Sequence, residues 1–213
     1  TEQLAAINLG TPMQNIITNF GSGITVAGAV LIAQYIGAGE KEDARSMANQ
    51  IFICAMGFAV VCAALCFLGT PAIVNWLGAD GGTAYYARVY LRVVIWDMPF
   101  LYMVNIFSAV HQAQGDTVRP MLLNLGGITL NLFLDPFFMI ILDMGTAGAA
   151  LATLLAKAVP ATVAFILLCR PENDICLNRR YMRLQKEKLG MILKVGLPTA
   201  IGGSTMQLGF LLM

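Results

Sequence analysis

The stretch MLLNLGGITLNLFLDPFFMIIL, residues 121–142, is long and apolar, yet it carries Asn131, Asp135 and Pro136. About 20 apolar residues are enough for a helix to cross the hydrocarbon core of a bilayer. An ionised side chain at that depth costs at least about 2.5–3.5 kcal/mol, so it usually faces water or a partner group. The stretch therefore predicts a membrane-spanning helix that has an acid with a functional role on one face.

The rest of the chain has the same apolar character. Of its 213 residues, 58% are hydrophobic and only 12% are charged, whereas ordinary soluble domains contain about a quarter charged residues. The composition predicts an all-α polytopic membrane helix bundle in the cell (cytoplasmic) membrane, with almost no sequence left for a soluble domain. Six apolar stretches are candidate spans, at residues 16–36, 51–67, 89–110, 121–142, 147–168 and 192–213.

The basic residues indicate how the bundle is oriented. Short cytoplasmic loops of membrane proteins are enriched in Lys and Arg. Nine basic residues lie in the connections that follow the first, third and fifth stretches, whereas Arg88 alone lies on the opposite side. We predict that these three connections face the cytoplasm and that the net charge of +1 does not indicate a nucleic-acid partner. A lipid-headgroup or nucleic-acid patch in residues 169–191 is a less favoured interpretation.

Turn signals divide the chain further. In QGDTVRP, residues 114–120, Asp116 or Thr117 is expected to cap the next helix, with Pro120 in its first turn. GTP, residues 69–71, is expected to end the second stretch.

The expected division is a set of first-lobe helices, a cytoplasmic linker and the start of a second bundle, at residues 1–168, 169–191 and 192–213. Because the chain lacks an initial Met and stops inside an apolar stretch, we expect it to be a fragment of a longer polytopic protein.

Helical periodicity aligns the polar residues of three stretches, because residues three or four apart share one helix face. This alignment predicts a water-accessible cavity between the helices. The alternative is a set of polar contacts that only hold neighbouring helices together. The three predicted stripes are Asn8, Thr11, Asn15, Asn19 and Gly23; Asp97, Asn105 and Ser108; and Asn124, Gly127, Asn131 and Asp135.

Three ionisable groups fall at a similar depth. At a rise of about 1.5 Å per residue, Asp135, Asp97 and Lys157 lie about 10, 12 and 16 Å below the outer edge of their spans. We expect Lys157 to form an ion pair with Asp135 or Asp97, whereas the alternative is a lysine that reaches to the interface. Pro136 cannot donate a hydrogen bond to the carbonyl of Leu132, which weakens the helix beside the acid. We expect a bend here whose angle responds to the charge on Asp135, so that it acts as a switch.

Four motifs together carry a family resemblance. They are LIAQYIGAGEKEDAR (31–45), QGDTVRPMLLNLGGITLNLFLDPFF (114–138), GTAGAALAT (145–153) and LKVGLPTAI (193–201). In this order and spacing they resemble the multidrug and toxic compound extrusion (MATE) transporters, and among them the branch named for a DNA-damage-inducible protein. The resemblance implies two six-helix lobes around a cavity. This chain then supplies helices 2 to 6 of the first lobe, the cytoplasmic linker and the start of helix 7.

The resemblance also implies a function, that of a secondary active antiporter. It exports amphipathic, often cationic compounds in exchange for protons or sodium, with no cofactor beyond the coupling ion and no metal. Asn131 and Asp135 match the motif that handles the cation. Ser108 stands where many relatives carry Asn, and Lys157 where they carry a neutral polar residue. The expected partners are a small-molecule substrate, membrane lipid and the second lobe of the same full-length chain.

Two other functions are less favoured. A flippase for lipid-linked oligosaccharides or peptidoglycan precursors needs a strongly basic cavity, and only Lys157 and Arg92 are placed to provide one. An intramembrane enzyme needs a nucleophile and base or a set of metal ligands. The single histidine, His111, is expected to be exposed in a cytoplasmic loop, and the five cysteines lack metal-ligand spacing. The sequence therefore favours a transporter over an enzyme.

Overall fold

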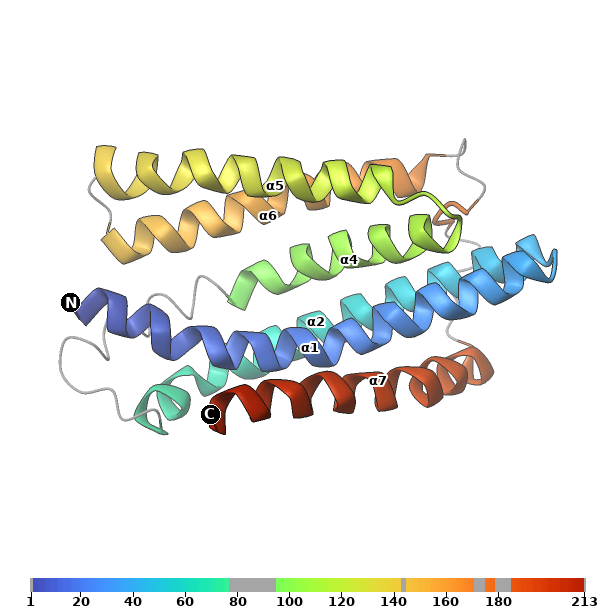
Figure 1. The fold of residues 1–213 in the computed structure, drawn as a ribbon, viewed down its shortest axis with the longest axis horizontal. Helices are drawn as coiled ribbons and strands as arrows, with labels where there is room; N and C mark the ends of the chain where they lie inside the picture. Colours follow the sequence, from blue (N-terminus) through green and yellow to red (C-terminus); the bar gives the residue numbers. More distant parts are fainter. Residues whose placement is uncertain (1, 77–94, 143–144, 171–174, 179–184, 213) are drawn as a thin grey trace.

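The computed structural model describes residues 2–76, 95–142, 145–170, 175–178 and 185–212, and this part of the chain is helical and contains no strand (Figure 1). Two short elements accompany the long helices: the 3₁₀-helix η1 (Ile95–Asp97) and the π-helix η2 (Phe137–Ile141). Each predicted apolar stretch overlaps one long helix, so the all-α prediction is confirmed. The long helices are α1 (Glu2–Gly37), α2 (Lys41–Trp76), α4 (Met98–Ala113), α5 (Val118–Pro136), α6 (Gly145–Cys169) and α7 (Lys186–Leu212).

Helix α4 lies in the middle of the bundle. Helices α1, α2 and α7 pack together on one side of it, and α5 and α6 pack together on the other (Figure 1). Large side chains from four helices, Ile32, Ile51, Phe107 and Leu168, are almost fully buried in the shared core. The C-terminal ends of α1, α4 and α6 lie at the same end of the bundle (Figure 1), which agrees with the predicted grouping of the loops that follow these helices.

Helix α2 is longer than expected. It continues through residues 69–71 to Trp76, so the prediction that GTP ends this helix is wrong. A proline inside a helix removes one backbone hydrogen bond, but its fixed φ of about −65° is compatible with helical geometry. Because apolar residues flank this proline on both sides, one lost hydrogen bond does not end the helix.

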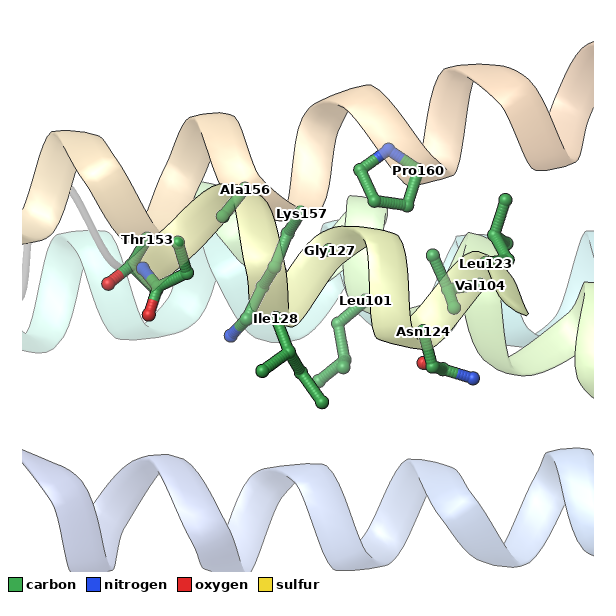
Figure 2. A pocket seen from close by; sticks show the side chains of 11 residues that line it. Leu101, Val104, Leu123, Asn124, Gly127, Ile128, Thr153, Ala156, Lys157 and Pro160 are labelled. Atoms are coloured by element: carbon green, nitrogen blue, oxygen red, sulfur yellow. The ribbon is translucent and has the colours of Figure 1, made fainter. Parts of the chain in front are cut away.

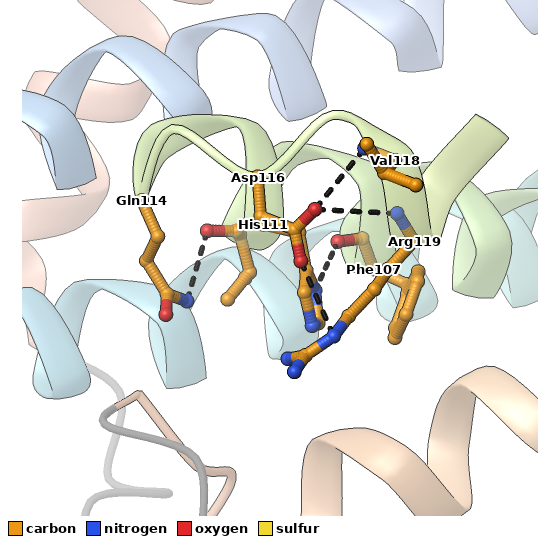
Figure 3. Close-up of polar contacts among 7 residues, drawn as sticks. Phe107, His111, Gln114, Asp116, Val118 and Arg119 are labelled. Carbon is orange, nitrogen blue, oxygen red and sulfur yellow. Dashed lines mark hydrogen bonds and ion pairs between the residues drawn. The ribbon is translucent and has the colours of Figure 1, made fainter.

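The turn between α4 and α5 contains the predicted cap (Figure 3). Gly115 has a φ of +82°, a conformation that residues with a Cβ rarely adopt. Oδ1 of Asp116 accepts hydrogen bonds from the backbone N–H groups of Val118 (3.1 Å) and Arg119 (3.2 Å). Its Oδ2 lies 3.3 Å from Nε of Arg119. Pro120 lies in the first turn of α5, so the prediction for the start of this helix is confirmed.

His111 lies in the last turn of α4 and is only 3% exposed, so the expectation of an exposed histidine is wrong. Its Nδ1 lies 3.0 Å from the carbonyl oxygen of Phe107, and the two rings have centroids 4.0 Å apart (Figure 3). Helix α4 extends three residues beyond the apolar stretch, and this extension carries the histidine into the packed interior.

Much of the apolar surface faces outward. On α5, Ile128, Leu132 and Phe133 are each more than two-thirds exposed. Within the described residues, three helical segments are long and apolar enough to cross a membrane: Lys41–Thr70, Val118–Ile141 and Gly148–Cys169. Large contiguous apolar surfaces are uncommon on soluble monomers. The exposed apolar side chains of these helices are stabilised by contact with lipid tails or with another apolar surface.

Small residues allow α1 and α7 to approach each other closely. A Cβ added to Gly23 would lie 2.7 Å from the carbonyl oxygen of Gly196 and 2.8 Å from Cβ of Ala200. A Cβ added to Gly196 would lie 3.1 Å from the carbonyl oxygen of Gly23. Small residues are typical of close helix contacts in membranes, where van der Waals packing drives association. The two glycines therefore set the distance between α1 and α7.

We predict that Gly23→Ala in the full-length protein lowers the midpoint of thermal unfolding in detergent. The new methyl group forces α1 and α7 apart, and overpacking of this kind typically costs about 1–3 kcal/mol. Gly57→Ala is the matched control, because no described atom outside its chain neighbours and its own helix backbone lies within 4 Å of the added Cβ, and alanine favours the helix. Equal midpoints for the two variants would show that the contact between α1 and α7 is not tightly packed.

Candidate functional site

Helix α5 carries the predicted polar stripe. Nδ2 of Asn131 donates a hydrogen bond to Oδ1 of Asp135 at 3.5 Å, and Nδ2 of Asn124 donates to the carbonyl oxygen of Pro120 at 2.9 Å. Asn124, Gly127 and Asn131 all line one cavity, which confirms that they share a face. Asp135 continues the stripe one turn beyond the cavity wall and is partly buried. The acid is therefore connected to the cavity through Asn131.

The cavity has a volume of about 250 Å³ and lies among α4, α5 and α6 (Figure 2). Its wall is mainly apolar with a few polar groups, which is the composition typical of small-molecule sites. The lining residues are Leu101 and Val104 from α4; Leu123, Asn124, Gly127, Ile128 and Asn131 from α5; and Thr153, Ala156, Lys157 and Pro160 from α6.

Pro160 changes the backbone chemistry of this wall. It has no N–H to donate to the carbonyl of Ala156, one turn earlier in α6. A Cβ added to Gly127 would lie 3.2 Å from that carbonyl oxygen and 3.1 Å from Cγ of Pro160. Glycine therefore allows α5 to approach α6 where a carbonyl oxygen is available as an acceptor. The predicted polar stripes do not include this acceptor, although Pro160, four residues after Ala156, is the sequence signal for it.

Lys157 forms an ion pair with Asp97. The predicted pairing with one of the two acids is thus confirmed, and the partner is Asp97 rather than Asp135. Asp97 directly precedes α4 and its side chain is fully buried, whereas the Lys157 side chain is 28% exposed and lines the cavity. Lys157 therefore does not reach to the interface. It joins the start of α4 to the middle of α6.

The helix changes its hydrogen-bonding pattern directly beside Asp135. Helix α5 ends at Pro136 and the π-helix η2 follows. The backbone N–H of Phe137 donates to the carbonyl of Leu134, and that of Leu142 donates to the carbonyl of Phe137 at 3.2 Å. Because Pro136 cannot donate to Leu132, the regular pattern is interrupted here, and π-helical turns are frequent at functional sites. The expected weak point beside the acid is present.

The remaining predicted site residues lie elsewhere. Oγ of Ser108 donates to the carbonyl oxygen of Val104 at 3.0 Å, and Ser108 is not part of the cavity wall. At a rise of about 1.5 Å per residue, Ser108 lies about 16 Å along the helix from Asp97. Ser108 is therefore far from the end of the cavity at which Lys157 forms its ion pair with Asp97. Asn15 and Asn19 belong to α1, but their side chains lie outside the described part of the structure.

We predict that Lys157→Met strongly destabilises the full-length protein, because removing one partner of a buried ion pair typically costs about 3–5 kcal/mol. The double variant Lys157→Met/Asp97→Leu should recover most of this loss, since apolar replacement of both partners is often nearly neutral. Thermal unfolding in detergent measures both effects. If the double variant is no more stable than Lys157→Met, the pair does not contribute in this way.

The relatives of this chain share one described activity. A family model described as MatE matches residues 1–137. The chain is 25% identical over 198 residues to the multidrug export protein MepA of Staphylococcus saprophyticus. This match covers 93% of this chain and 44% of that protein. The chain is 26% identical over 200 residues to MepA of Staphylococcus aureus, with the same coverage. The chain thus spans less than half the length of these relatives.

Solved structures agree over nearly the whole chain. A crystal structure of MATE in the bent conformation matches with a TM-score of 0.92 and 29% identity, covering 99% of this chain and 47% of that one. An inward-facing and an outward-facing structure of a multidrug resistance MATE family transporter of the MOP superfamily each match with a TM-score of 0.90 and 29% identity. The match to the inward-facing structure covers 97% of this chain and 47% of that chain, and the match to the outward-facing structure covers 98% and 46%. The chain therefore belongs to the MATE family of multidrug efflux transporters, which are multi-pass membrane proteins and not enzymes.

Proposed function

We propose that the full-length protein is a secondary active antiporter that exports amphipathic compounds, cationic ones among them, in exchange for protons or sodium. Membership of the MATE family supports the export of small molecules. The observation that carries the proposal is the contact between Asn131 and Asp135 at the end of the cavity, beside the interrupted helix.

Asp135 has the chemistry that exchange of a small cation needs. Its carboxylate can bind a proton, and together with the amide oxygen of Asn131 it offers the hard oxygen ligands that sodium prefers. Each charge moved down a potential of 100 mV supplies about 2.3 kcal/mol. Because Pro136 follows the acid directly, loss or gain of charge on Asp135 acts on the weakest point of α5.

The cavity suits an amphipathic compound. Leu101, Val104 and Leu123 offer apolar surface, and the Ala156 carbonyl offers an acceptor for a substrate N–H. A flippase for diphosphate-linked lipids is less favoured, because Lys157 is the one basic residue in the described cavity wall and it is paired with Asp97. Arg92, the other candidate cation, lies outside the described residues.

We predict that Asp135→Asn in the full-length protein reduces ethidium efflux to the level of cells that lack the protein, with unchanged expression. The amide has nearly the same size but cannot gain or lose a charge. Glu42→Gln, a change of an exposed acid near the start of α2, should leave efflux intact. Full efflux by the Asp135 variant would refute the proposal. Dissipating the proton and sodium gradients separately, in cells with the unmodified protein, identifies the coupling ion.

Pro136→Ala should reduce efflux several-fold while raising the midpoint of thermal unfolding. The restored N–H can bond to the carbonyl of Leu132, which favours a continuous α-helix in place of the π-helical turn. Pro120→Ala is the control, since Pro120 lies in the first turn, where helix N–H groups need no partner within the helix. Unchanged efflux by the Pro136 variant would show that this weak point has no part in transport.

A further inference from the structure

The linker between α6 and α7 is built into the core of the first lobe. Its sequence is charge-rich and predicts a polar connection, yet Ile175 and Leu177 are only 3% and 7% exposed and pack in the same core as Leu168 and Ile192. The backbone N–H of Leu177 donates to the carbonyl of Leu168 at 2.9 Å. The described linker residues therefore do not form a loose tether.

Two fully buried amides of α2, Asn49 and Gln50, hold the linker backbone. Oδ1 of Asn49 accepts a hydrogen bond from the N–H of Asn178, and Oε1 of Gln50 accepts one from the N–H of Gln185, both at 3.1 Å. Nδ2 of Asn49 also donates to the carbonyl of Arg45 at 2.8 Å. Buried amides are costly unless they are hydrogen-bonded. Asn49 and Gln50 therefore act as an amide clamp on two points of the linker.

The first turns of α7 are attached to the same lobe. Nζ of Lys188 lies 2.8 Å from Oδ1 of Asp43, and it also lies 5.8 Å from the centroid of the Tyr35 ring, within the range of a cation–π contact. The Tyr35 hydroxyl lies 3.8 Å from Sδ of Met191. Further along α7, Ile192 enters the core. An ion pair, an aromatic contact and apolar burial thus fasten this end of α7 to α1 and α2.

We propose that the linker and α7 as far as Ala200 move together with the first lobe, so that the bending between the lobes occurs beyond Ala200 and not in the linker. The close contact of Gly196 and Ala200 with Gly23 extends the attachment to that point. Gly202 and Gly203 follow in the sequence, and glycine is among the least favourable residues for a rigid helix.

Relatives of this chain have been solved in two states, since an inward-facing and an outward-facing MATE structure both match it. The inference rests on the proposed function only because it assumes that the protein alternates between such states.

A reversible crosslink tests where the bending occurs. The full-length protein, with its native cysteines replaced, carries Tyr35→Cys and Met191→Cys, which are joined by a bifunctional methanethiosulfonate and reconstituted in liposomes. We expect the linked protein to keep at least about half of the ethidium transport rate of the unlinked protein. Loss of transport on linking, with recovery after reduction, would overturn the proposal, because it would place the bending between α1 and the start of α7.

Hydrogen exchange tests the amide clamp without any need for transport. Gln50→Leu keeps a similar volume but removes the acceptor, so exchange in the peptide that contains Gln185 should become at least tenfold faster. Gln50→Glu retains an acceptor oxygen and should preserve the slow exchange. Unchanged exchange in the Leu variant would overturn the clamp. If the unlinked protein fails to transport, that failure contradicts the proposed function, and the exchange experiment still decides the clamp.

Discussion

The rest of this structure depends on one constraint: a polar group placed among apolar helices needs a partner within the protein. In hydrocarbon, water cannot satisfy such a group, and an isolated charge is costly. Lys157 meets the constraint through Asp97, and Asn131 meets it through Asp135. Each of these contacts ties a chemical group to a helix position, so the constraint that stabilises the bundle also places the groups that we propose to act in transport.

Two prolines loosen the bundle at places where this chemistry is concentrated. Pro160 leaves the Ala156 carbonyl without its usual helical donor at the cavity wall, and Pro136 interrupts α5 beside Asp135. The opposite end of the bundle is fastened, because the buried amides Asn49 and Gln50 hold the linker. The described helices therefore combine an end that is tied to the linker by hydrogen bonds with a region around the cavity where prolines interrupt the helices.

Sequence reasoning succeeded where the physics is local. The cap at Asp116 and the helix break beside Asp135 depend on residues within one or two turns, and both are present. It failed where the outcome depends on distant neighbours. His111 was expected to be exposed, but the extension of α4 buries it. Ser108, which we expected to take part in cation coupling, is not part of the cavity wall. Helical periodicity shows which residues share a face, but it does not show which helix packs against that face.

The amino-acid sequence alone determined the helices and the polar face of α5, and its basic residues predict how the helices alternate across the membrane. These features follow from apolar length, basic loops and a 3.6-residue period, and each can be read from neighbouring residues. Only the tertiary structure decided that Lys157 pairs with Asp97 and that the charge-rich linker enters the core. Both outcomes require groups far apart in the sequence to meet, and that meeting is set by how the helices pack.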